Sequence, residues 1–216
     1  MTYHGEDQID RIVRDAFFPD LSYRGVIVEV GAAGPEFLSL SRHFRDSGWR
    51  VVAIEPNPDF CEQHREAGFE ILQYACGDRD EDGVDFEVVY QPASYQGGQV
   101  TYESFSALKV LGTYRVLNPG IEATTIKVDL RRLDTILAQH AADVMTIDVL
   151  TIDVEGWEIG VLEGLSLARY KPKVVILENL LDDDAYRLYM REHGYRVHLS
   201  MNPNEIYVPI AASMSR

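Results

Sequence analysis

The sequence has few cysteines, few cationic side chains and no long apolar run. Only Cys61 and Cys76 occur in 216 residues, and neither lies at the short Cys/His spacing of structural zinc sites. No apolar run is as long as a membrane span, and segment 1–10 lacks the basic and apolar parts of a signal peptide. We therefore expect a cytoplasmic protein with two free thiols and no membrane partner.

Positive charge is also scarce. Lys and Arg number 20 against 35 Asp and Glu, which gives a formal net charge of -15. Such a charge repels phosphate backbones, so we expect no nucleic-acid partner. The composition, 46% hydrophobic and 25% charged, is typical of a globular protein, and the length suits one α/β domain.

Short apolar runs alternate with segments of helical periodicity along most of the chain. The segments that predict strands are 26–30, 51–54, 70–75, 86–90, 125–129, 149–153, 173–178, 195–199 and 205–209. The segments that predict helices are 9–18, 36–47, the stretch from Pro58 to about Ala67, 132–139, 157–163 and 182–194. This alternation predicts a parallel sheet with right-handed crossovers, and the last two strands predict an antiparallel hairpin at its edge.

We divide the chain into an N-terminal helical cap, residues 1–25, and one α/β domain, residues 26–216. The amphipathic helix of the cap could cover the sheet or the substrate mouth, and it is the predicted contact of a homo-oligomer. Residues 91–120 are rich in turn signals, which we interpret as an insertion near the active site.

A nucleoside site is predicted after the first two strands. Gly31 and Gly34 follow the first strand, where bare backbone and helix N-terminal amides can approach a ligand, although glycines there can also serve only to turn the chain. Glu55 ends the second strand about twenty residues later, where a carboxylate can accept both hydrogen bonds of a ribose diol. A third glycine of the dinucleotide pattern is missing, which favours a nucleoside without phosphates over NAD.

The segment 149–165 carries the most specific motif of the chain. Its strand ends in Ile152-Asp153-Val154-Glu155-Gly156-Trp157-Glu158, and Val161-Leu162-Glu163-Gly164 follow. This motif resembles the hallmark of the FkbM family of S-adenosylmethionine-dependent methyltransferases. The resemblance extends to residues 28–32, 53–58, 75–78 and 128–134.

The chain departs from that family at two places. Ala33-Gly34-Pro35 replaces the usual Asn-x-Gly of the first loop, and Thr151 stands where the family tends to have lysine. The first change concerns the geometry of the cofactor loop, and the second concerns either the acceptor pocket or a packed strand position.

The resemblance implies a Rossmann-like class I methyltransferase fold, with a mostly parallel seven-stranded sheet and helices on both faces. It implies S-adenosylmethionine as cofactor and a small-molecule acceptor, for which we expect O-methylation of a hydroxyl on a sugar or secondary metabolite. An N-methyltransferase, an NAD-dependent oxidoreductase and a non-catalytic nucleoside-binding module are the alternatives. The implied cofactor contacts are Glu29, Gly31, Ala32 and Glu55, with Gly77 and Asp78 near the adenine and Asp153 facing the methyl group.

Oxygen donors at two neighbouring strand ends predict a metal site. Asp153 ends one strand, and Glu178 and Asn179 end the next, so these side chains should meet at the carboxyl edge of the sheet. The arrangement is similar to the Asp…Asp-Asn magnesium site of catechol-type O-methyltransferases, and oxygen ligands suit Mg²⁺ or Ca²⁺. In the alternative interpretation Asp153 is a direct base or a contact to the cofactor amine, and Glu178 and Asn179 cap the next turn.

Other side chains of these segments have simpler interpretations. Glu155 and Glu158 lie in a first helical turn, where acids suit the helix dipole regardless of function. The aromatic residues Tyr95, Tyr102, Phe105 and Trp157 are candidates for the walls of an acceptor pocket or for core packing.

Overall fold

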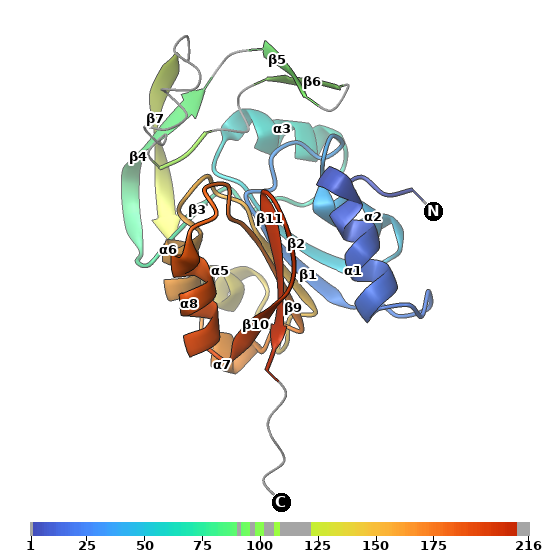
Figure 1. Cartoon of the computed structure of the whole chain (residues 1–216). Coiled ribbons are helices and arrows are strands. Elements are labelled where there is room, and N and C mark those ends of the chain that lie inside the picture. Colours follow the sequence, from blue (N-terminus) through green and yellow to red (C-terminus); the bar gives the residue numbers. More distant parts are fainter. Residues whose placement is uncertain (1, 90–91, 96–97, 102–105, 109–121, 211–216) are drawn as a thin grey trace, which may run out of the picture.

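The computed structural model describes residues 2–89, 92–95, 98–101, 106–108 and 122–210, with only the backbone described at 92–95 and 98–101. A six-stranded sheet in the order β10-β11-β9-β8-β1-β2 forms its centre (Figure 1). The strands are β1 (Val26–Val30), β2 (Arg50–Ile54), β8 (Val149–Ile152), β9 (Val174–Glu178), β10 (Tyr195–Met201) and β11 (Asn204–Pro209). β2, β1, β8 and β9 are parallel, and β11 is antiparallel to both of its neighbours.

A second sheet stands beside the first. It has the order β3-β7-β4, with β3 at Ala75–Cys76, β4 at Glu81–Val89 and β7 at Ala123–Arg131. A separate hairpin joins β5 (Pro92–Tyr95) to β6 (Gly98–Thr101). In Figure 1, β4 and β7 lie to one side of the central sheet. The rest of the predicted insertion 91–120, apart from residues 106–108, lies outside the described residues.

The α/β class is confirmed, but the single seven-stranded sheet is wrong. The predicted strand 70–75 makes only one bridge to the central sheet, between Leu72 and Ile54. The chain then turns away, and Ala75 and Cys76 pair with Leu130 and Arg131 of β7. β7 also pairs along its length with β4. The strands β3, β7 and β4 therefore form one sheet, and the backbone partners of β3 lie in this second sheet.

Helices lie on both faces of the central sheet, because alternate strand residues point to opposite sides. On one face, Ile27 and Val149 share a core with Ile9 of α1 (Ile9–Phe17) and Phe44 of α2 (Leu40–Asp46). The other face carries a larger core. It packs against α5 (Leu133–His140), α6 (Glu158–Glu163), α7 (Leu167–Tyr170) and α8 (Asp184–Glu192).

Two further helical elements complete the described part of the chain. The 3-10 turn η1 (Glu6–Gln8) precedes α1, and α3 (Pro58–Glu66) follows β2. The cap helix α1 packs on one face of the central sheet. Glu6 of η1 and Ile9 of α1 also line the large cavity described in the next subsection. No helix within the described ranges is long and apolar enough to cross a membrane.

The first loop departs from the predicted strand-turn-helix unit. α2 begins at Leu40 rather than near Glu36, because segment 31–39 stays irregular, with positive φ at Ala33 (43°) and Leu38 (55°). The N-terminal amides of α2 therefore do not follow the glycine turn. One of them, the Ser41 amide, donates instead to Glu29 Oε1 at 3.1 Å.

Candidate active site

The carboxyl ends of β1, β2 and β8 meet beside two adjoining cavities that share Gly31, Phe60 and Asp153. The small cavity, between Glu55 and Trp157, has a volume of about 90 Å³. The large cavity, between loop 31–38 and Thr151, has a volume of about 790 Å³. Small-molecule sites usually span roughly 300–1,000 Å³. The small cavity is below this range and the large cavity is within it, so an elongated ligand would extend from the small cavity into the large one.

Gly31 directly follows β1 and packs against Asp153, which directly follows β8. It adopts a positive φ of 81°, and a Cβ atom there would lie 1.7 Å from the Asp153 carbonyl oxygen. The amides of Gly31 and Ala32 both donate to the Ile54 carbonyl of β2, at 3.0 and 3.1 Å. Because Gly31 has no side chain, the backbone of Asp153 can pack directly against it, and this contact places Asp153 at the edge of the cavities. Gly34, by contrast, has no positive φ, and a Cβ there would approach Gln63 Oε1 at 3.2 Å.

Glu55 follows β2 and faces the small cavity from a buried position. Its Oε2 accepts from the Ala33 amide at 2.9 Å, and its Oε1 accepts from the Asn57 amide at 2.8 Å. Burial raises the pKa of Glu55 to about 7, although these two amides oppose the shift. Each oxygen keeps a second lone pair, so the carboxylate can still accept hydrogen bonds from a ligand diol.

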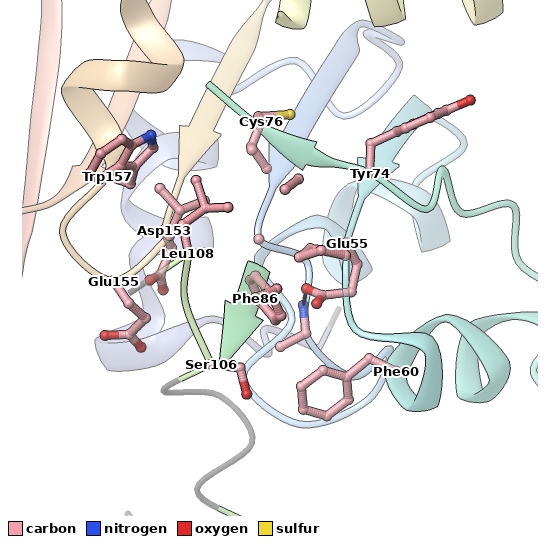
Figure 2. A pocket seen from close by; sticks show the side chains of 16 residues that line it. Glu55, Phe60, Tyr74, Cys76, Phe86, Ser106, Leu108, Asp153, Glu155 and Trp157 are labelled. Carbon is pink, nitrogen blue, oxygen red and sulfur yellow. Dashed lines mark hydrogen bonds between the residues drawn. The ribbon is translucent and has the colours of Figure 1, made fainter. Parts of the chain in front are cut away.

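The small cavity is otherwise mostly apolar. Figure 2 shows Glu55, Phe60 and Tyr74 on one side of it, and Asp153, Glu155 and Trp157 on the other. Its apolar and aromatic lining consists of Val30, Pro56, Phe60, Tyr74, Ala75, Cys76, Phe86, Leu108, Val154 and Trp157. Such walls beside a carboxylate that can accept two hydrogen bonds suit a planar base attached to a sugar.

Glu29 lies beneath the large cavity. Its carboxylate is 5% exposed, Oε1 accepts from the Ser41 amide, and Oε2 is buried without a hydrogen bond of good geometry. Burial raises the pKa of this carboxyl, while hydrogen bonds from Ser41 oppose the shift. The neighbour of Glu29 across the strand pair is Thr151, which also lines the large cavity.

Three carboxylates gather at the ends of β8 and β9. One oxygen each of Asp153, Glu155 and Glu178 lies within 4.8 Å of the others. The Asp153 side chain is open to the cavities although protein surrounds it, and Glu155 is buried. This group could hold a divalent cation through oxygen ligands or share protons among its members.

The carboxyls of Asp153 and Glu178 are within hydrogen-bond reach. Burial raises the pKa of Glu178 well above its usual range, and the charges of Asp153 and Glu155 raise it further. Burial also raises the pKa of Asp153, but the hydrogen bond from Glu178 opposes that shift. Glu178 therefore keeps its proton to higher pH than Asp153 does.

The third predicted metal ligand, Asn179, faces elsewhere. Its Oδ1 accepts from the Asp183 amide at 2.8 Å, and its Nδ2 donates to the Asp183 carbonyl at 3.1 Å. Asn179 thus caps the turn before α8, as the alternative interpretation expected for it. Glu155, which we interpreted as a structural acid, takes its place beside Asp153 and Glu178.

Glu158 fixes the loop that carries these acids. It is 0% exposed, and its Oε1 accepts from the amides of Val154 and Gly156, both at 3.0 Å. Its Oε2 accepts from the Tyr186 hydroxyl at 2.5 Å. The hallmark motif therefore contains one acid that shapes the loop and two that face the cavity.

Gly77 and Asp78 lie behind the small cavity rather than among its lining residues. A Cβ on Gly164 would lie 2.1 Å from the Gly77 carbonyl oxygen, so these two glycines allow close contact between β3 and the end of α6. Asp78 is exposed and pairs with Arg79 at 3.0 Å. Tyr74, Ala75 and Cys76 are the residues of this segment that line the cavity.

Comparison with known families gives one match. The model of the methyltransferase FkbM domain matches residues 29–197, most of the chain. The chain belongs to the FkbM methyltransferase family. A search of curated proteins finds no match for it.

The matched FkbM region contains every candidate residue from Glu29 to Asn179 and leaves out α1 and β11. Sequence reasoning missed several cavity residues of this FkbM domain. Glu155 had a signal, since it stands in the hallmark motif, and Tyr74 directly precedes a motif segment. Phe86 had none, because only the second sheet brings it to the cavity.

Proposed function

We propose that this FkbM domain transfers a methyl group from S-adenosylmethionine to a small-molecule acceptor, at a hydroxyl of a sugar or secondary metabolite. The observation that carries the proposal is the position of buried Glu55 in an apolar cavity that opens, past Gly31, onto Asp153. An adenosine would place its diol at Glu55 and its base among Phe60, Tyr74 and neighbouring apolar side chains.

When bound, S-adenosylmethionine supplies an activated methyl group on a sulfonium centre. The residues of the chain then have to position the acceptor, exclude water and take up one proton. Asp153 is open to both cavities, so its carboxylate is the group we assign to receive the acceptor's hydroxyl proton. Glu178 would hold Asp153 in place through their hydrogen bond.

Titration calorimetry with S-adenosylhomocysteine and NAD tests the cofactor assignment. We expect binding of S-adenosylhomocysteine and none of NAD. NAD binding without S-adenosylhomocysteine binding would overturn the proposal in favour of an oxidoreductase. A mass-shift screen of glycosides and amines with S-adenosylmethionine would then separate O-methylation from N-methylation.

Substitution of the assigned base tests the chemical step. Asp153→Asn keeps the size of the side chain but removes its capacity to accept a proton, and we expect at least a 100-fold loss of turnover, in line with the usual contribution of a positioned base. Asp183→Asn, at the exposed cap of α8, is the matched control. If Asp153→Asn keeps the turnover of the wild type, Asp153 is not the base that accepts the hydroxyl proton.

A chelator experiment separates proton sharing from metal binding in the acid group. If Mg²⁺ or Ca²⁺ assists, dialysis against a chelator abolishes turnover, and Glu155→Gln weakens binding of the added ion in calorimetry. If the three acids only share protons, turnover is unchanged by the chelator.

A further inference from the structure

The segment before α1 closes one side of the large cavity. Glu6 lines this cavity together with Leu38 of the first loop and Asn204 of β11. Residues 2–8, which we call the strap, precede the matched FkbM region. The strap therefore adds a wall to the cavity from outside that region.

Two contacts hold the strap beside the cavity. Gly5 forms a parallel bridge with Leu38, which also lines the cavity. The side-chain amide of Asn204 donates to Glu6 Oε2 at 2.9 Å. The strap thus connects the first loop to the start of β11.

Three more contacts hold the beginning of the strap. The Tyr3 ring stacks on the His43 ring of α2, with 4.3 Å between their centroids. Nδ1 of His43 lies 2.9 Å from the Thr2 carbonyl oxygen. The His4 amide donates at 2.7 Å to the buried carboxylate of Asp10. These are single contacts and not a paired strand, so they can break and form again while the sheet stays folded.

The backbone between the strap and α1 is strained. Asp7 and Gln8 are consecutive residues with φ of 48° and 56°, in the left-handed region that residues with a Cβ atom disfavour. Residues other than glycine keep such angles where surrounding contacts fix them, and they cluster at ligand clamps and switch segments. The two residues directly precede Ile9, where α1 begins. When the strap contacts break, both residues can relax, so the strain favours opening at this point.

We propose that the strap opens and closes over the large cavity, with Asp7 and Gln8 as its hinge, and that the closed strap retains the bound ligand. The identity of this ligand as S-adenosylmethionine rests on the proposed function. The contacts of Tyr3 and Glu6 favour the closed position, whereas the left-handed hinge favours the open one. Loss of a strap contact therefore speeds release of the ligand.

Two tyrosine variants test whether the strap retains the ligand. Tyr3→Ala removes the stack on His43, and Tyr189→Ala removes a similar stack on His193 at the end of α8, with 4.2 Å between centroids. The readout is the rate at which labelled S-adenosylhomocysteine leaves the protein during a chase with unlabelled ligand. We expect Tyr3→Ala to speed release about two- to tenfold, the usual contribution of an aromatic pair, and Tyr189→Ala to leave the rate unchanged. An unchanged rate in Tyr3→Ala, or equal changes in both variants, overturns the proposal.

A second pair of variants tests the contact with β11. Glu6→Ala and Glu6→Gln both remove the charge, but only the glutamine keeps an oxygen that can accept from Asn204. We expect Glu6→Ala to speed release about two- to tenfold, in line with the loss of one hydrogen bond, and Glu6→Gln to restore most of the retention. Equal release from the two variants would show that the hydrogen bond to Asn204 does not hold the strap closed, against the proposal.

Hydrogen exchange in the ligand-free protein separates this proposal from the cofactor assignment. If S-adenosylhomocysteine does not bind, the cofactor assignment fails, but opening of the strap can still be measured. The reporters are the His4 amide, bonded to Asp10, and the Gln8 amide, bonded to the Gly5 carbonyl at 3.0 Å. We expect both to exchange faster than the amides of β1, and about two- to tenfold faster again in Tyr3→Ala. Exchange of both amides at the rate of β1 would show that the strap opens only when the whole fold does, which overturns the proposal.

Discussion

Single side chains of the site differ in how they use their hydrogen-bonding atoms. Both carboxylate oxygens of Glu158 accept hydrogen bonds, one from amides of its own loop and the other from the Tyr186 hydroxyl, so Glu158 stabilises the loop. Glu55 also accepts from two backbone amides, but it faces a cavity and keeps free lone pairs there. The same residue type therefore supports a loop in one place and leaves hydrogen-bonding capacity toward a cavity in the other.

Glu55→Gln should weaken binding of S-adenosylhomocysteine about 10- to 100-fold, since hydrogen bonds to a charged acceptor are worth roughly 1.5–3 kcal/mol. Titration calorimetry measures the change. Glu70→Gln, on an exposed residue after α3, should bind as the wild type does. An unchanged dissociation constant for Glu55→Gln would mean that the diol lies elsewhere.

At the level of elements, the contact between the ends of β1 and β8 decides where loop 153–158 lies. Gly31 permits it, because its positive φ and lack of a side chain let the Asp153 carbonyl approach. The acid loop 153–158 is then held from its other end by Glu158.

Gly31→Ala should lower the free energy of unfolding by about 2–5 kcal/mol, the sum of a left-handed backbone cost and an overpacking cost. Gly68→Ala is the matched control, because Gly68 has a similar φ of 77° and open space around its missing Cβ. It should lose only about 1 kcal/mol. Urea denaturation measures both, and equal losses would show that contact with Asp153 is unimportant.

For the whole molecule, buried acids create a dependence of stability on pH. Burial is the main cause of a raised pKa at Glu29 and Glu55, which are both buried. A carboxyl whose pKa is higher in the folded state binds its proton more tightly there than in the unfolded chain. Its contribution is complete below the unfolded pKa, near 4.5 for Glu55, and is lost as pH rises through the folded pKa of about 7.

The free energy of unfolding should therefore fall between about pH 5 and pH 8, by on the order of 3 kcal/mol from Glu55 alone. Urea denaturation across this range measures the slope, and Glu55→Gln should make it shallower. A stability that rises with pH in this window would contradict the assigned shifts.

The α/β class, the FkbM family and the order of most elements can be predicted from the amino-acid sequence alone. These depend on local patterns: apolar runs, helical periodicity, glycine stops and a seven-residue motif at the end of β8. Such patterns survive in one dimension because each depends on residues close together in the chain.

Which side chains face the cavities follows from how the elements pack in three dimensions. Residues 70–75 keep only the Leu72 bridge to the central sheet, because Ala75 and the following Cys76 pair with β7, 55 residues further along the chain. The packing also turns Asn179 into a cap and brings Glu155 beside Glu178, because the loop after β8 folds around buried Glu158. The first of these outcomes depends on pairing between strands far apart in the sequence. The others depend on short-range hydrogen bonds of Asn179 and Glu158, whose effect on the site is set by the pairing of β8 with β9.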